Sequence, residues 1–149
     1  MIIKDLLAGI LTNQRLVIIK QNSSVFEAAS TMLKNKCGAL LVCDSKNSLL
    51  GIITERDLAF RVIPKNLDTK KTLVNKIMTK NVDTISPEKT TIDAIQMMKK
   101  KGFRHLPVLE KKKIVGILSM RDLYDAHSEI LQDSLKKHQE FMFGTGYGS

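Results

Sequence analysis

The chain has 149 residues, of which 43% are hydrophobic; this is enough for one compact domain or two small halves with a shared core, and it argues against extended disorder. The formal charge is +9, but most basic residues are lysines spread over predicted turns and helix faces, which is more typical of a solvated surface than of a nucleic-acid reader. Cys37 and Cys43 are too few and too isolated for a zinc site, so we expect no metal. No apolar stretch approaches the ~18 residues of a membrane span, and the start of the chain lacks the layout of a signal peptide. We therefore expect a cytoplasmic protein with no membrane insertion.

The first half of the chain predicts a strand, a helix, two strands and a second helix. In chain order these are a strand at 16–19, a helix over 24–36, strands at 39–43 and 49–53, and a helix from about 55 to 63. Ser24, with Glu27 three residues later, has the pattern of a capping box at the start of the first helix. Pro64 ends the second helix, and residues 65–72 are expected to be a linker.

The second half predicts the same order of elements. We expect a strand at 82–85, a helix over 88–101, strands at 105–109 and 113–118, and a final helix from residue 120 to about 142. Ser86 and Pro87 are interpreted as the N-cap and the first position of the helix after them. The final helix carries an irregular apolar stripe formed by Leu123, Ile130, Leu131, Leu135, Phe141 and Met142, and residues 144–149 are expected to be a flexible tail.

The two halves correspond residue by residue. Ala28 and Met32 match Ala94 and Met98 at an offset of 66 residues. The segment Gly-Ile-Ile-Thr-Glu-Arg-Asp-Leu at 51–58 matches Gly-Ile-Leu-Ser-Met-Arg-Asp-Leu at 116–123 at an offset of 65. Chance would not align both glycines, both hydroxyls, both arginines and both aspartates, so the chain contains an internal duplication.

These two segments in tandem resemble the cystathionine-β-synthase (CBS) domain family, over roughly residues 5–125; Phe-Arg-His-Leu-Pro-Val-Leu-Glu at 103–110 and Lys-Ile-Met-Thr at 76–79 support the resemblance. The resemblance implies an α/β (α+β) fold of two βαββα repeats packed with pseudo-two-fold symmetry, plus a C-terminal helix, as in stand-alone bacterial-type pairs. It divides the chain into a first repeat with an N-terminal helix at 1–65, a second repeat at 66–126, and a helix with a flexible tail at 127–149. It also implies a homodimer and, as regulated partner, a separate enzyme or transporter.

The tetrapeptides that begin at Thr54 and Ser119 each open a helix directly after a strand, and two interpretations stay open. In the first, they are helix caps, in which the hydroxyl accepts a hydrogen bond from a backbone N–H and the aspartate is favoured by the helix dipole. In the second, they hold a ligand: the N–H groups and the arginine bind a phosphate, and Asp57 or Asp122 accepts hydrogen bonds from a ribose diol. The duplication favours the second interpretation, and the two roles are compatible.

The resemblance also implies two ligand clefts, because in the family the aspartate of one repeat faces the early strands of the other. The first cleft is assigned Thr12, Val17, Cys37, Gly38, Ala39, Ser119, Arg121 and Asp122, with backbone groups at Val17 and near Gly38 contacting the adenine edge. The second is assigned Thr54, Arg56, Asp57, Met78, Asp83, Phe103, Arg104 and His105; Arg104 and His105 match basic positions that approach phosphates in the regulatory subunit of AMP-activated protein kinase.

The two clefts are expected to be unequal. Asp83 stands where the other cleft has the apolar Val17, and if its carboxylate faces the cleft it repels phosphate. The Asp122 cleft therefore suits adenine better, while the Asp57 cleft is richer in phosphate-binding charge. His105 has an equally good alternative interpretation, as a strand histidine packed in a polar pocket.

The resemblance implies a non-catalytic sensor of AMP, ADP, ATP, S-adenosylmethionine or NAD, none of them acting as a catalytic cofactor. No nucleophile, base and orienting group are predicted in one cleft, so we expect no enzymatic activity. Two alternatives stay open: a basic nucleic-acid-binding protein, which strong salt dependence would reveal, and a structural protein that binds a partner through the stripe on its last helix.

Overall fold

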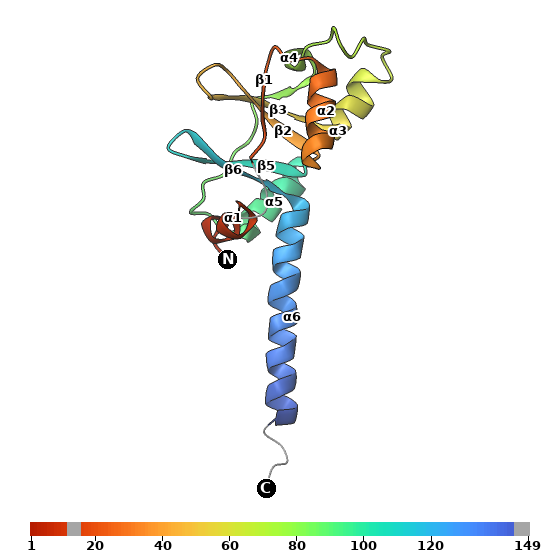
Figure 1. The fold of residues 1–149 in the computed structure, drawn as a ribbon. Helices are drawn as coiled ribbons and strands as arrows, with labels where there is room; N and C mark the ends of the chain where they lie inside the picture. Colours follow the sequence, from red (N-terminus) through yellow and green to blue (C-terminus); the bar gives the residue numbers. More distant parts are fainter. Residues whose placement is uncertain (12–15, 145–149) are drawn as a thin grey trace.

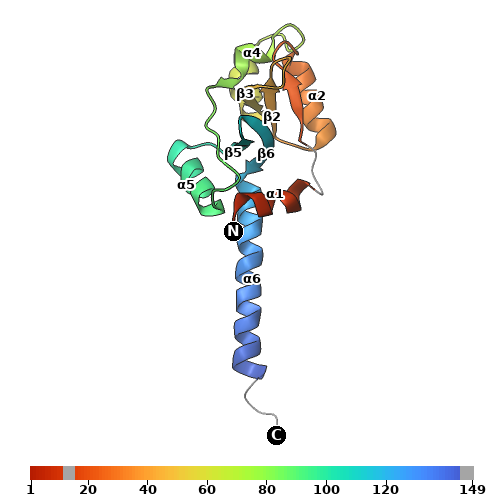
Figure 2. The same ribbon diagram turned by 90° about the vertical axis from the view of Figure 1, so that its left-hand side faces the viewer.

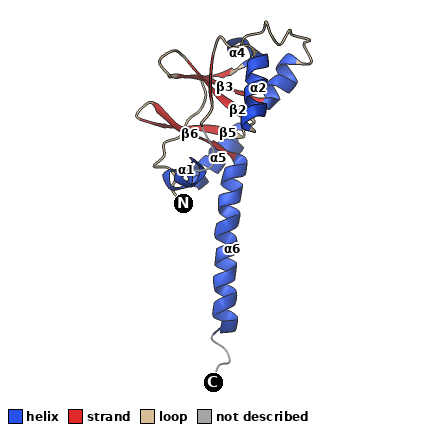
Figure 3. Cartoon of the chain, in the orientation of Figure 1, coloured by secondary structure: helices blue, strands red, loops and turns tan. Residues whose placement is uncertain are grey.

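The computed structural model describes residues 1–11 and 16–144, which form two small sheets with their helices and one long C-terminal helix that extends away from them (Figure 1). The first half contains α1 (Ile3–Leu11), β1 (Ile18–Lys20), α2 (Val25–Asn35), β2 (Ala39–Cys43), β3 (Leu49–Thr54), the short α3 (Glu55–Asp57) and the π-helical η1 (Leu58–Val62). The second half contains α4 (Val74–Ile77), β4 (Thr79–Lys80), α5 (Thr91–Lys101), β5 (His105–Glu110), β6 (Lys113–Ser119) and α6 (Met120–Gly144). The predicted mixed α/β class with a C-terminal helix is confirmed (Figure 3).

The duplication is visible in one hairpin of each sheet, β2-β3 and β5-β6. One sheet has the order β1-β2-β3-β4, with β1 parallel to β2 and the other pairs antiparallel, and the second sheet is the antiparallel pair β5-β6. The pairing shifts register between Val42 and Cys43 in the first sheet and between Val108 and Leu109 in the second. These irregularities lie 66 residues apart, so both halves bend the same strand at the same place.

Strand β2 is buried on both faces, and this joins the two halves. Leu40 and Val42 pack in the core of the first half, against α2. Ala39 and Leu41, which alternate with them, point to the other face, where they form a separate buried cluster with Ile52 of β3. Ile114 and Ile117 of β6 pack against this cluster, so the two sheets meet through apolar side chains, each of which contributes on the order of 1.5–3 kcal/mol when fully buried.

Helix α1 precedes the first repeat in sequence but packs on the second half (Figure 2). Ile3 and Leu7 are 0% and 4% exposed in the core formed by α5, β5, β6 and α6. A Cβ atom on Gly116 would lie 2.7 Å from Leu7 Cδ2, so a larger residue there would displace the end of the Leu7 side chain where α1 packs on β6. Gly51, at the same repeat position, is more restricted: its Cβ would lie 2.5 Å from the backbone carbonyl oxygen of Thr79, so the pairing of β3 with β4 requires glycine there.

The predicted strand at 82–85 is wrong. Only Ile85 makes a bridge, to Val108, and it does so in parallel orientation. The Ile85 N–H donates to the Pro107 carbonyl at 3.0 Å, and the Leu109 N–H donates to the Ile85 carbonyl at 3.0 Å.

Proline at 107 explains why this pairing does not extend toward residue 83. In the first half, the Leu41 N–H donates to the Val17 carbonyl at 3.4 Å beside β1. Pro107 is the repeat counterpart of Leu41 and has no N–H, so it cannot make the corresponding bond to Asp83. The first-half strand also differs from its predicted range, since β1 covers Ile18–Lys20 rather than 16–19.

The predicted helix start at Ser86 and Pro87 is also wrong, because these residues form a turn in which the Lys89 N–H donates to the Ser86 carbonyl at 3.1 Å. Helix α5 begins at Thr91, capped by Thr90 and Asp93 in a full capping box. This box is the repeat counterpart of the one at Ser24, where the predicted capping box is confirmed.

The other predicted elements hold with small changes at their ends. Strands β2, β3, β5 and β6 lie within one residue of the predicted ranges, and α6 runs two residues past its predicted end. The helix predicted from about 55 to 63 is a short α-helix that continues as η1. Residues 65–72 contain no helix or strand, yet Thr69 and Thr72 accept hydrogen bonds from the backbone at the start of α2. Of the predicted tail, residues 145–149 lie outside the described part of the chain.

We predict that Thr90→Ala lowers the free energy of unfolding by about 1 kcal/mol, because it removes the side-chain cap of α5. Ser86→Ala is the matched control and should cost less than about 0.5 kcal/mol, since Ser86 caps no helix. Urea unfolding of both variants measures the difference. Equal losses would contradict the assignment of Thr90 as the cap.

Candidate ligand-binding clefts

Both copies of the hydroxyl–arginine–aspartate motif fold into the same local structure at the end of a strand. The Thr54 N–H donates to Asp57 Oδ2 at 2.8 Å, and the Asp57 N–H donates to Thr54 Oγ1 at 3.3 Å. At the second copy, the corresponding distances between Ser119 and Asp122 are 2.8 and 3.1 Å. The capping interpretation is therefore correct for both copies, and it fixes the direction of each carboxylate.

The Asp57 motif lies in a cleft of about 360 Å³ between the two halves. Of the residues predicted for this cleft, those that line it are Thr54, Arg56, Asp57, Asp83, Phe103, Arg104 and His105. Met78 does not line it, because its side chain is 8% exposed in the core of the first half. Sequence reasoning missed Phe60, Arg61 and Asn81, which also line the cleft.

The Asp122 motif lies in a second and larger cleft of about 820 Å³. The predicted residues that line it are Cys37, Gly38, Ala39, Ser119, Arg121 and Asp122. Val17 packs against the core of the first half and is not part of the lining. Thr12 lies outside the described residues, so its predicted position in this cleft stays a prediction.

Three charged or titratable residues line both clefts and form the wall between them: Glu55, Arg104 and His105. Glu55 was not predicted. Its N–H donates to the Gly38 carbonyl at 2.9 Å. Its carboxylate lies so close to Gly38 that a Cβ atom added there would be 3.1 Å from it. The sequence signal for it is the mismatch between the repeats, since the duplication places Met120 at the position of Glu55.

The two clefts differ in the residue one turn after each aspartate. Arg61 Nε lies 3.5 Å from Asp57 Oδ1, and Arg61 Nη1 donates to the Ile77 carbonyl at 3.0 Å. The residue at this position of the second repeat is Ala126, and among the described residues no hydrogen bond or ion pair to Asp122 Oδ1 is found. One carboxylate therefore has both oxygens engaged, whereas the other keeps an oxygen that can accept a hydrogen bond.

The arginine of each motif also has a different neighbour. The Arg56 guanidinium carbon lies 5.6 Å from the ring centroid of Phe60, in cation–π contact. Arg121 Nε instead lies 3.9 Å from the carboxylate of Asp125, the repeat counterpart of Phe60. The Asp57 cleft thus presents an arginine beside an aromatic ring, while the arginine of the Asp122 cleft is exposed and lies beside a carboxylate, with which it makes only a weak surface pair.

Asp83 lines the Asp57 cleft, and its carboxylate Oδ2 lies 3.5 Å from Lys101 Nζ. This pair is exposed, so it weakens the repulsion that Asp83 exerts on an anion without cancelling it. Within residues 1–11 and 16–144, no group of His, Cys, Asp or Glu side chains is arranged to hold a metal ion. Burial raises the pKa of the Cys37 and Cys43 thiols.

His105 is a half-buried residue of β5, and its pKa depends on burial and on the charged residues around it. Burial lowers its pKa below the usual value. The carboxylates of Glu55 and Asp122 act in the opposite direction, and Arg104 adds to the lowering. The imidazole is therefore held close to charged groups of both signs.

Comparison with known proteins agrees with this architecture. The CBS domain family model matches residues 3–63 and 74–129. A 17.7 kDa protein of Acidianus ambivalens is 36% identical over 133 residues, covering 89% of this chain and 79% of the relative. A CBS domain-containing protein of Arabidopsis thaliana is 38% identical over 113 residues, covering 75% of this chain, and the match spans only 21% of that protein's length.

Solved structures show the same fold. The CBS-domain containing protein ATU1752 from Agrobacterium tumefaciens superposes with a TM-score of 0.78 at 35% identity, covering 85% of this chain and 92% of that chain. The CBS domain pair of protein MJ0100, solved in complex with 5′-methylthioadenosine and S-adenosyl-L-methionine, superposes with a TM-score of 0.76 at 26% identity, covering 87% and 97%.

We predict that the free energy of unfolding decreases as the pH falls from about 7 to about 5.5, and that His105→Gln makes this decrease smaller. Below the usual histidine pKa, the unfolded chain takes up a proton that His105 in the folded protein resists, so acid favours unfolding. Urea titrations at several pH values measure the slope.

His138→Gln is the control for the loss of a histidine, because His138 is exposed on α6. It should leave the slope of stability against pH close to that of the parent protein. If His105→Gln and the parent protein show the same slope, the lowered pKa of His105 is wrong.

Proposed function

The chain belongs to the CBS domain family, and on that premise we propose that it is a regulatory module that binds an adenine nucleotide or an adenosyl compound in the clefts between its two repeats. One observation carries the proposal: the duplicated capping box directs a carboxylate into each of two clefts lined by arginine and backbone groups. CBS domains are generally regulatory and non-catalytic, and we extend this to the chain as a whole. The adenosyl ligands bound to the MJ0100 pair support the ligand class.

Asp122 is the residue best prepared for a ribose. Its Oδ2 accepts hydrogen bonds from the N–H and the hydroxyl of Ser119, which hold the carboxylate in one orientation. Its Oδ1 is left to accept hydrogen bonds from the two hydroxyls of a ribose. Gly38 and Ala39 lie in the same cleft and have small side chains, which leave room for a planar base beside them.

The Asp57 cleft is better suited to phosphate. Arg56, Arg104 and His105 line it together, and Arg56 has an aromatic neighbour where Arg121 has an acidic one. A ribose there would have to compete with Arg61 for Asp57 Oδ1. The two clefts are therefore unequal, with adenosine favoured near Asp122 and phosphate favoured near Arg56.

Binding regulates only when the ligand has different affinities for two states of the protein or of its complex. The clefts lie between the halves, so a ligand that contacts both can bias how they pack and which partner they bind. We propose an enzyme or transporter as the regulated partner, a homodimer as the working form and the cytoplasm as its location. Within the described ranges, no helix has both the length and the apolarity to cross a bilayer.

We predict that Asp122→Asn weakens the binding of adenosine by about tenfold to a hundredfold, because a hydrogen bond to a charged group contributes about 1.5–3 kcal/mol. The asparagine oxygen can keep the cap at Ser119, and its NH2 then replaces the accepting oxygen in the cleft. Isothermal titration calorimetry with adenosine, AMP and S-adenosylmethionine measures the change.

Asp93→Asn is the matched control, because Asp93 forms the same capping box with Thr90 on α5, away from both clefts. It should cost similar stability and leave ligand affinity unchanged. The proposed site is wrong if Asp122→Asn and Asp57→Asn both bind like the parent protein. Mass spectrometry of small molecules released from denatured, freshly purified protein identifies the natural ligand.

We also predict that Arg56→Gln lowers the ratio of AMP affinity to adenosine affinity by about tenfold, which removes most of the difference between the two ligands. Arg121→Gln should preserve this ratio. The reason is that Arg121 is already paired with a carboxylate, that of Asp125, whereas Arg56 lies against the ring of Phe60. Calorimetry with the two ligands on each variant provides the ratio. A loss in Arg121→Gln alone would place the phosphate in the Asp122 cleft instead.

A further inference from the structure

Two equivalent contacts of the duplicated motif differ in charge. In the first repeat the Glu55 N–H donates to the Gly38 carbonyl at 2.9 Å, and in the second the Met120 N–H donates to the Arg104 carbonyl at 2.8 Å. The offsets of the duplication make Glu55 the counterpart of Met120, and Gly38 the counterpart of Arg104. One junction therefore combines an acidic residue with a glycine, while the other combines an apolar residue with a basic one.

The carboxylate of Glu55 lies on the side of the Asp122 cleft. Both of its oxygens would be 3.1 Å from a Cβ atom on Gly38, so the side chain covers this glycine. Gly38 lines the Asp122 cleft and is absent from the lining of the Asp57 cleft. Although Glu55 lines both clefts, its negative charge is therefore placed in the Asp122 cleft.

Two carboxylate groups of the Asp122 cleft lack a basic partner. In residues 1–11 and 16–144 no hydrogen bond or ion pair of the Glu55 carboxylate is found, and none to Asp122 Oδ1. In the Asp57 cleft, by contrast, Asp57 is paired with Arg61, and Asp83 has a lysine partner. The Asp122 cleft therefore presents more uncompensated negative charge to a ligand.

Two basic residues on the rim of the Asp122 cleft offset this charge only in part. The side chain of Arg121 is 90% exposed and lies beside Asp125. Lys36 also lines this cleft and is exposed at the end of α2. Charges in such exposed positions are screened by water and salt, so they act weakly on a ligand inside the cleft.

His105 adds little positive charge to the wall between the clefts. Burial lowers the pKa of His105, and the carboxylates of Glu55 and Asp122 counteract only part of this effect. The imidazole is therefore neutral in most molecules at pH 7. This leaves Arg104 as the basic group of the wall, and no ion pair between it and Glu55 is found in the described part of the chain.

We propose that Glu55 makes the Asp122 cleft selective for adenosyl compounds whose 5′ substituent is cationic or uncharged, and against those with a 5′-phosphate. The inference rests on the proposed function, because it requires a ribose held by Asp122 in the cleft that the Glu55 carboxylate also lines. That carboxylate repels a phosphate and attracts a cation. Glu55 is exposed, so solvent limits each effect to about fivefold in affinity.

The test is calorimetry with adenosine, AMP and 5′-amino-5′-deoxyadenosine, which share the adenosyl group and differ in the charge at the 5′ position. All proteins carry Arg56→Gln, which is predicted to weaken phosphate binding in the Asp57 cleft. We expect Glu55→Gln to raise the ratio of AMP affinity to adenosine affinity by about fivefold, and to lower the ratio of amine affinity to adenosine affinity by about fivefold. The ratios cancel any general loss of affinity from altered packing.

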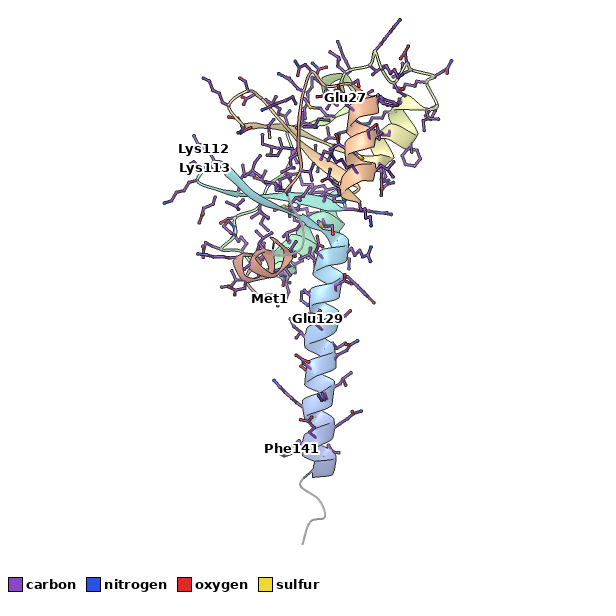
Figure 4. All side chains as sticks on the ribbon, viewed as in Figure 1. Met1, Glu27, Lys112, Lys113, Glu129 and Phe141 are labelled. Atoms are coloured by element: carbon purple, nitrogen blue, oxygen red, sulfur yellow. The ribbon has the colours of Figure 1, made fainter. Side chains whose placement is uncertain are left out.

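Glu129→Gln is the matched control for the loss of one glutamate charge. Figure 4 shows Glu129 on the projecting part of α6, and this residue lines neither cleft. Both affinity ratios should stay unchanged in this variant. Unchanged ratios in Glu55→Gln, or an equal shift in Glu129→Gln, overturn the inference.

A further variant assigns the effect to one cleft. When Asp122→Asn is added, the shift caused by Glu55→Gln should disappear, because the ribose is no longer held beside Glu55. A shift that persists places the effect in the Asp57 cleft, which overturns this inference and leaves the proposed function standing. If the parent protein binds none of the three compounds, the proposed function fails and this inference fails with it.

Discussion

The contact between the two sheets is the interaction on which the rest of the structure depends. It exists because β2 is apolar at every position, so that Ala39 and Leu41 remain to be buried after Leu40 and Val42 have packed in the core of the first half. Apolar side chains of β6 cover this second face. Closing the contact brings the end of β3 next to the start of β5, and the clefts form around that junction.

The strand-to-helix junctions serve structure and the proposed function with the same atoms. Each aspartate caps a helix through one carboxylate oxygen. The same cap orients the second oxygen, so capping and the proposed ligand binding are compatible. The repeats then diverged at the next turn, where the pair Phe60 and Arg61 in one half corresponds to Asp125 and Ala126 in the other. Divergence at two positions is enough to make one cleft more basic and to leave the other with a carboxylate oxygen available to a ligand.

The clefts are also physically linked to each other and to the C-terminal helix. Glu55, Arg104 and His105 face both clefts, so a charge placed in one changes the electrostatic potential in the other. Asp122 belongs to the first turn of α6. Asp122 therefore links the larger cleft to the C-terminal helix.

The sequence by itself determined the duplication, most strands and the two motifs, because these follow from local periodicity and from the spacing between repeats; the resemblance that the motifs carry implied the fold class. Tertiary structure decided the rest. Only the approach of the two halves shows that Glu55 faces both clefts and that Met78 faces neither. No strand forms at 82–85 because Pro107 has no N–H with which to extend the pairing. Helix α5 begins at Thr91 because the hydroxyl of Thr90, and not that of Ser86, accepts a hydrogen bond from a backbone N–H of the helix. Contacts between residues far apart in the chain cannot be read from either segment alone, since each segment is compatible with more than one partner.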